Sequence, residues 1–132
     1  MSIRVLLVDD SAAHLELMRL VLDLEDDFDV VGEATDGEDG VRLARELTPD
    51  LVVSDIEMPR LDGLHALPGY RAGAPDALVV LMSSRAPSDA GPAARAAGAD
   101  HYMDKGTGVD TIINELRQLF LNSRARQRAS GD

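Results

Sequence analysis

Residues 3–11 read Ile3-Arg4-Val5-Leu6-Leu7-Val8-Asp9-Asp10-Ser11. Six residues that suit extended backbone end abruptly at two aspartates, and the serine after them is a common helix N-cap. A short apolar strand that leads directly into a capped helix predicts the first β-α unit of an α/β domain.

The same alternation recurs along the rest of the chain. Strand-like runs lie at 30–35, 51–55, 77–82 and 100–104, and helix-like spacing follows at 11–24, 35–47, 64–71, 90–97 and 107–120. Strands that alternate with helices run parallel and are joined by right-handed crossovers. The pattern therefore predicts an α/β fold of five successive β-α units, (βα)5.

Two helices contain residues that disfavour helical backbone. Pro68-Gly69 interrupts the third helix, and Gly91-Pro92 interrupts the fourth. Because proline fits best in the first turn of a helix, the sequence predicts a fourth helix that begins near Gly91. Such a helix would face inward mainly through Ala94 and Ala97, and alanine buries little area.

Apolar spacing and charge predict how the chain is organised at its two ends. The buried face of the first helix is predicted from leucine and valine at helical intervals, namely Leu17, Leu20, Val21 and Leu24. The domain is expected to span 1–122. Residues 123–132, which carry Arg124, Arg126 and Arg128 and little apolar content, are expected to form a flexible basic tail that frays.

Composition excludes several classes of protein. The chain has 132 residues, enough for one domain, and it contains no cysteine, which excludes disulfide scaffolds and thiolate metal sites. A net charge of −11 argues against a nucleic-acid interface, which needs a basic face. Apolar runs are too short to span a bilayer, and acidic residues come too early for a signal peptide, so a cytoplasmic location is expected.

Polar residues stand where the predicted strands end. Asp9 and Asp10 follow the first strand, Asp55 ends the third, Ser83 ends the fourth and Lys105 follows the fifth. In parallel sheets these positions converge on one edge, where ligands bind. Adjacent carboxylates repel one another, and a hard cation such as Mg²⁺ relieves that repulsion. His14, His65 and His101 lack metal-ligand spacing and are expected at the surface.

Taken in order, these segments resemble the receiver domain of two-component response regulators over residues 3–121. The similarity lies in Val5-Leu6-Leu7-Val8-Asp9-Asp10-Ser11, Asp55-Ile56-Glu57-Met58-Pro59 with Asp62-Gly63, Ser83, Gly98-Ala99-Asp100, Tyr102 and Lys105. The resemblance implies a flavodoxin-like three-layer sandwich with a parallel sheet in strand order 2-1-3-4-5. It also implies a phosphorylation-dependent switch.

The resemblance implies a role for each acidic residue of the motif. Asp55 would accept a phosphoryl group from the phosphohistidine of a sensor histidine kinase or phosphotransfer protein. Asp10 and Asp55 would ligate Mg²⁺ directly, Asp9 would act through water, and the backbone carbonyl of Glu57 would complete the protein ligands.

The remaining motif residues would couple phosphorylation to a change of shape. Lys105 would pair with Asp55 and then with its phosphate, Ser83 would take a phosphoryl oxygen, and Tyr102 would turn inward behind it. The face made by the fourth helix, fifth strand and fifth helix would then shift its population. Glu57 and Arg85, each two positions after a site residue, would set the lifetime of the phosphoryl group.

One motif position departs from the family, since Gly106 stands where proline commonly follows the lysine. Other classes remain as alternatives: a Mg²⁺-dependent phosphatase with an aspartate nucleophile, a flavin-binding module, or a pseudo-receiver that only binds partners. The chain is expected to be either a stand-alone receiver acting on a downstream protein or the front part of a longer regulator with an output domain. It is expected to be a monomer or a phosphorylation-dependent homodimer, without direct contact to nucleic acid or membrane.

Overall fold

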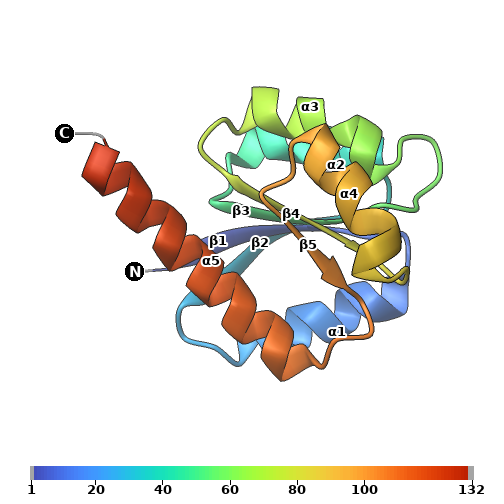
Figure 1. The fold of residues 1–132 in the computed structure, drawn as a ribbon. Coiled ribbons are helices and arrows are strands. Elements are labelled where there is room, and N and C mark those ends of the chain that lie inside the picture. The colour runs from blue at the N-terminus through green and yellow to red at the C-terminus, as the bar shows by residue number, and fades with distance from the viewer. Residues whose placement is uncertain (1, 131–132) are drawn as a thin grey trace.

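A computed structural model describes residues 2–130, and five strands alternate with five helices along them (Figure 1). The strands are β1 (Ile3–Val8), β2 (Phe28–Ala34), β3 (Leu51–Asp55), β4 (Leu78–Ser83) and β5 (His101–Asp104). The helices are α1 (Ala12–Asp23), α2 (Gly37–Leu47), α3 (Gly63–Gly73), α4 (Pro87–Ala97) and α5 (Val109–Ser130). The strands form one parallel sheet in the order β2-β1-β3-β4-β5, which confirms the predicted fold.

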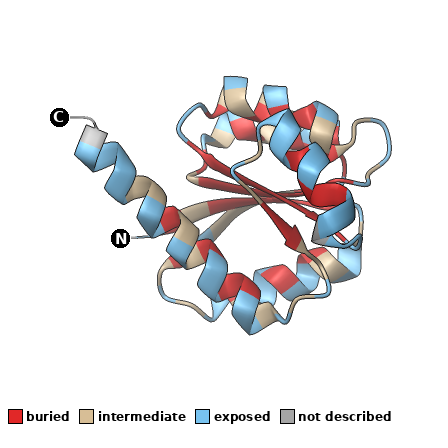
Figure 2. Ribbon diagram, viewed as in Figure 1, coloured by how far each residue is buried: buried red, intermediate tan, exposed pale blue. Residues whose placement is uncertain are grey.

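The sheet is the middle of three layers. Helices α1 and α5 cover one face, and α2, α3 and α4 cover the other (Figure 1). Each face packs its own apolar core, and every residue of β3 and β4 is buried (Figure 2). Continuous burial agrees with strands covered on both sides and leaves the strand ends as the place where polar groups meet solvent.

The buried face of α1 differs from the predicted one. Its buried residues are Leu15, Met18 and Leu22. Of the predicted inward residues, Val21 is partly buried against the core, whereas Leu17, Leu20 and Leu24 are 43%, 58% and 80% exposed. The helix carries two apolar stripes. The Ser11 hydroxyl accepts a hydrogen bond from the His14 N–H at 3.2 Å, which fixes where the first turn begins and therefore which stripe faces the sheet.

Both proline-containing helices are longer than predicted. Helix α3 runs without a break through Pro68, and α4 begins at Pro87 and runs through Pro92, so a start near Gly91 is wrong. Both Pro68 and Pro92 lie on the solvent side, where the lost N–H bond costs least. The inward side chains of α4 are Ala90 and Ala94, and Ala97 is exposed.

The expected frayed tail is helical as far as the structure describes it. Helix α5 continues through Ser130 and extends past the edge of the sheet (Figure 1). Arg124 holds this extension, because its guanidinium lies 3.0 Å from Asp50 Oδ1 and 4.8 Å from the centroid of the Phe120 ring. Residues 131–132 of the predicted tail lie outside the described residues. No helix within residues 2–130 is both long and apolar enough to cross a membrane.

Candidate functional site

The carboxyl ends of the strands bring the predicted acidic residues together. Asp9 follows β1 and Asp55 ends β3, the central neighbour of β1 in the sheet. One carboxylate oxygen from each of Asp9, Asp10 and Asp55 lies within 4.8 Å of the other two. Asp9 and Asp55 are buried, whereas Asp10 is exposed, so the cluster opens to solvent on the side of Asp10.

Lys105 provides the positive charge beside these carboxylates. Its Nζ lies 3.0 Å from Asp9 Oδ2 and 3.0 Å from Asp55 Oδ2, and its backbone N–H donates to the Ser83 carbonyl at 2.8 Å. Burial alone would lower the pKa of Lys105, but the two carboxylates raise it above its ordinary value. The next residue, Gly106, donates its N–H to Asp104 Oδ1 at 2.7 Å, a bond that proline could not make.

Asp55 has one engaged oxygen and one free oxygen. Oδ2 accepts from Lys105, while Oδ1 is buried and has no hydrogen-bond partner among the described residues. Burial, followed by repulsion from Asp9 and Glu57, outweighs the attraction of Lys105 and raises the pKa of Asp55 to about 6. A buried carboxylate oxygen without a donor is poised to meet a cation or an electrophile.

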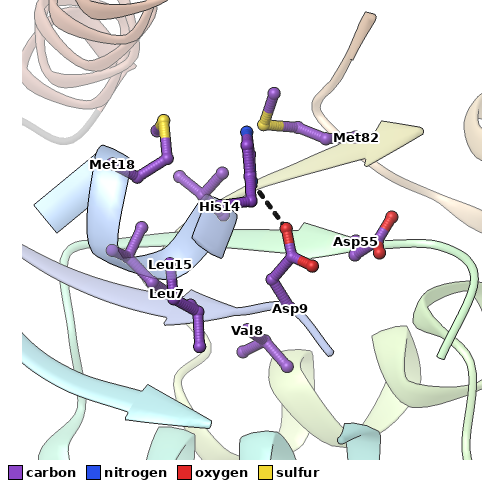
Figure 3. A pocket seen from close by; sticks show the side chains of 9 residues that line it. Leu7, Val8, Asp9, His14, Leu15, Met18, Asp55 and Met82 are labelled. Atoms are coloured by element: carbon purple, nitrogen blue, oxygen red, sulfur yellow. Dashed lines mark hydrogen bonds and ion pairs between the residues drawn. The ribbon is translucent and has the colours of Figure 1, made fainter. Parts of the chain in front are cut away.

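Asp9 is, by contrast, surrounded by donors. Its oxygens accept from the Ser11 N–H at 2.9 Å and from Lys105. They also accept from His14 Nδ1 at 2.6 Å (Figure 3). Burial acts to raise its pKa, but these hydrogen bonds hold the pKa below the ordinary value. Asp9 is therefore the anionic partner of Lys105 in this cluster.

The prediction of a surface role for His14 is wrong. Its side chain is 18% exposed and lies over the end of β1 against Asp9 (Figure 3). The signal in the sequence was its distance from Asp9, because a helix that begins directly after the strand end places its first turn above that end. His65 is exposed and bonds Asp62, and His101 lies 3.8 Å from Glu115 on α5, both away from the acidic cluster.

The donor set fits Mg²⁺. This ion is usually held by one or two carboxylates and keeps several waters, and here an exposed carboxylate and a free buried oxygen lie beside a third carboxylate. The loop after β3 stays close to Asp55, because a Cβ on Gly63 would lie only 2.2 Å from the Asp55 carbonyl oxygen. Asp9, Asp10 and Asp55 together form a group that could hold such an ion.

Ser83 belongs to a second polar network at the same edge. Its hydroxyl donates to Glu57 Oε1 at 2.6 Å and accepts from the Arg85 N–H at 3.1 Å. The Arg85 guanidinium lies 3.3 Å from Glu57 Oε2, so these two side chains form an ion pair at the mouth of the site. Tyr102 is already buried, and its hydroxyl donates to the Arg85 carbonyl at 2.5 Å.

Comparison with known proteins identifies the family to which this arrangement belongs. The sequence model of the response regulator receiver domain matches residues 5–117. The chain is a response regulator receiver domain. It is 37% identical over 123 residues to the response regulator GacA of Pseudomonas aeruginosa, which covers 92% of this chain and 57% of that protein.

Proteins from other bacteria are similar to this chain in sequence or in fold. A protein-glutamate methylesterase/protein-glutamine glutaminase of Symbiobacterium thermophilum is 41% identical over 129 residues, covering 97% of this chain and 36% of that protein. The solved response regulator domain of Thermotoga maritima CheB aligns with a TM-score of 0.82 and 32% identity, over 91% of this chain and 97% of that one. Thus the chain spans little more than half the length of GacA and about a third of the methylesterase.

Proposed function

We propose that this receiver domain accepts a phosphoryl group on Asp55 from a phosphohistidine and changes conformation in response. The observation that carries the proposal is Asp55 itself, a buried carboxylate with a free Oδ1 beside the Lys105 ammonium and two further aspartates. Membership of the receiver family supports the same role.

In the proposed transfer, an Asp55 carboxylate oxygen attacks phosphorus and the P–N bond to the donor imidazole breaks. The electron pair of that bond leaves with the imidazole nitrogen, which takes up a proton. Asp10, Asp55 and the Glu57 carbonyl would hold Mg²⁺ directly, with Asp9 acting through water. When bound, the ion neutralises charge on the phosphoryl oxygens. Lys105 is 3.0 Å from Asp55 Oδ2 and would pass from the carboxylate to a phosphoryl oxygen.

The proposed switch begins at Ser83. Its hydroxyl now donates to Glu57, and donation to a phosphoryl oxygen would break that bond and draw the loop between β4 and α4 toward Asp55. Tyr102 would follow, because its hydroxyl is held by the carbonyl of Arg85 in that loop. The result would be a population shift of the face made by α4, β5 and α5.

Incubation with Mg²⁺ and acetyl phosphate tests the phosphoacceptor. Mass spectrometry of the wild type should show one added phosphoryl group on the peptide that contains Asp55, and Asp55→Asn should gain none. Asp26→Asn is a matched control, because Asp26 is an exposed aspartate in the loop between α1 and β2. Equal phosphorylation of wild type and Asp55→Asn would overturn the assignment.

Metal titration tests the proposed division between the first two aspartates. Asp10→Ala should weaken Mg²⁺ binding more than Asp9→Ala, because a direct ligand contributes more than one that acts through water. Equal losses of affinity would contradict this division.

The proposed role also determines the partners. They are a sensor histidine kinase or phosphotransfer protein upstream, and a target protein or an attached output domain downstream. We propose a cytoplasmic switch that is a monomer or a phosphorylation-dependent homodimer, without turnover of a separate substrate. The phosphatase alternative needs a free acid–base group two residues after the nucleophile, and Glu57 at that position is engaged by Ser83 and Arg85.

A further inference from the structure

The proposed function leaves His14 without a role, although its Nδ1 lies 2.6 Å from Asp9 Oδ2. The imidazole rises from the first turn of α1 into a small pocket whose wall includes Leu15, Met18 and Met82 (Figure 3). The same wall includes the carboxylates of Asp9 and Asp55, so the imidazole lies between apolar side chains and the acidic cluster. The role of His14 is therefore to be sought in its contact with the Asp9 carboxylate.

Both oxygens of the Asp9 carboxylate are held by hydrogen-bond donors. Its Oδ1 accepts from the Ser11 N–H at 2.9 Å and from Lys105 at 3.2 Å. Its Oδ2 is hydrogen-bonded to His14 at 2.6 Å and forms an ion pair with Lys105 at 3.0 Å. An ionised carboxylate offers about four lone-pair sites, and these hydrogen bonds use three of them, which leaves one for a metal-bound water. Because Asp9 accepts from the other donors, His14 Nδ1 must carry the proton and donate it.

We infer that His14 is a positioning residue that holds Asp9 Oδ2 away from the inner coordination shell of Mg²⁺ and so weakens the affinity of the unphosphorylated domain for the ion. The inference rests on the proposed function, which places Mg²⁺ at this cluster. Direct ligation by Oδ2 would require the bond from His14 to break.

The other two carboxylates show what this restraint achieves. Asp10 is exposed and Asp55 Oδ1 has no partner among the described residues, so both are available to a metal ion. With Asp9 restrained, the protein supplies two carboxylates directly, and more coordination positions remain for water and for a phosphoryl oxygen. Releasing Asp9 would add a third direct carboxylate, which would bind the ion more tightly and leave fewer open positions.

Mg²⁺ titration of the unphosphorylated protein tests the inference. Backbone amide NMR shifts give the dissociation constant, since the chain has no tryptophan to report binding by fluorescence. His14→Met removes the N–H donor and fills the pocket, and it should lower the Kd roughly tenfold, the size of effect typical of groups that orient metal ligands. His14→Asn, which keeps an N–H donor close to the place of Nδ1, should stay near the wild-type Kd.

A double-mutant cycle separates the restraint on Asp9 from general effects of losing a histidine. In an Asp9→Asn background, His14→Met should leave the Kd unchanged, because the carboxylate that it releases is gone. His65→Met is the surface control, since His65 is exposed and pairs with Asp62 outside the cluster. His14→Ala repeats the test without a donor should methionine prevent folding, with the same tightening expected.

The outcomes distinguish the inference from the proposed function. A wild type that binds Mg²⁺ and a His14→Met variant that binds equally or more weakly would overturn the role of His14 alone. A wild type that binds no Mg²⁺ at this cluster would overturn the metal site and the inference together. If His14→Met lowers the Kd for Mg²⁺ equally in the wild-type and the Asp9→Asn backgrounds, the role of His14 is also refuted. The effect would then not depend on the Asp9 carboxylate.

Discussion

The ionised Asp55 carboxylate destabilises the folded state. Its pKa of about 6 lies above the ordinary value of 3.8, so between these values the folded protein binds a proton that the unfolded chain has released. The free energy of unfolding contributed by Asp55 therefore falls as pH rises from about 4 to about 6, and it stays low above that interval. The same charge is what attracts a cation or a phosphoryl group.

Asp55→Asn should consequently stabilise the domain at pH 7.5 in the presence of a metal chelator. The expected gain in the free energy of unfolding is about 1–3 kcal/mol, measured by urea denaturation of wild type and variant. The free energies of unfolding of wild type and variant should converge below pH 4, where the wild-type Asp55 carboxyl is protonated in both the folded and the unfolded state. If the variant is no more stable than wild type at pH 7.5, the ionised Asp55 carboxylate does not destabilise the folded state.

Lys105 lies where size matters as much as charge. Its Nζ is 3.0 Å from an oxygen of each of two carboxylates, a gap that a compact ammonium fills and a wide guanidinium fork does not. Lys105→Arg should keep the net charge yet impair both phosphorylation by acetyl phosphate and the conformational response. NMR spectra before and after phosphorylation measure both effects, and unaltered behaviour of the variant would refute the argument.

Glu57 and Arg85 should control how long the phosphoryl group persists. Their 3.3 Å ion pair at the mouth of the site is placed to screen an aspartyl phosphate from attacking water. Exposed pairs contribute only about 0–1 kcal/mol to stability, so the effect should appear in kinetics rather than in folding. Replacing both by alanine should speed phosphate loss severalfold, as timed by phosphate release, and an unchanged rate would mean that the pair does not screen the site.

Sequence reasoning placed the site residues well, because an aspartate or lysine directly after a strand has little freedom of position. Asp9, Asp10, Asp55 and Lys105 converge for that reason. The contact between His14 and Asp9 was missed because it depends on the rotation of α1 about its own axis. Apolar spacing alone did not give that rotation, since the helix carries two apolar stripes.

At the scale of elements, the sequence predicts which strands and helices exist and in what order, but it does not predict where the helices begin and end. Alternating patterns gave all five strands and helices in the observed order. The predicted start of α4 near Gly91 is too late, because Pro92 lies inside the helix and does not begin it. Burial of Ala90 before it and Ala94 after it keeps both sides of the proline in one helix, and this tertiary packing outweighs local propensity.

Helix α4 should nevertheless be weakly held. Its buried side chains are alanines, whereas α5 buries Ile112, Leu116 and Phe120, and burial stabilises by about 25 cal/mol per Å² of apolar surface. Amide hydrogen exchange should therefore show less protection from Asp89 to Ala97 than in the first half of α5. Equal protection of the two helices would contradict a loosely packed α4, and would leave the proposed switch face without its most mobile element.

At the scale of the whole molecule, α5 is tied to the rest of the chain by arginines at two places along its length. Arg117 on α5 donates to Asp27 Oδ2 at 2.6 Å and to Glu25 at 2.5 Å, and its guanidinium lies 5.4 Å from the centroid of the Phe28 ring. Arg124 adds a second tie at the far end of the sheet. Motion that starts at Ser83 should therefore spread into α4 more readily than along α5.

The leucines exposed on α1 and at its C-cap should govern the colloidal behaviour of the protein. Leu17, Leu20 and Leu24 face water on a chain whose net charge is −11 at pH 7, and mutual repulsion keeps such molecules apart. Near the isoelectric point of about 4.5 that repulsion vanishes, and the exposed leucines of different molecules can then associate. Light scattering should show a sharp rise in turbidity as pH approaches 4.5, and a Leu20→Gln, Leu24→Gln variant should remain clear to a higher protein concentration. Equal turbidity of the two proteins would assign the precipitation to charge alone.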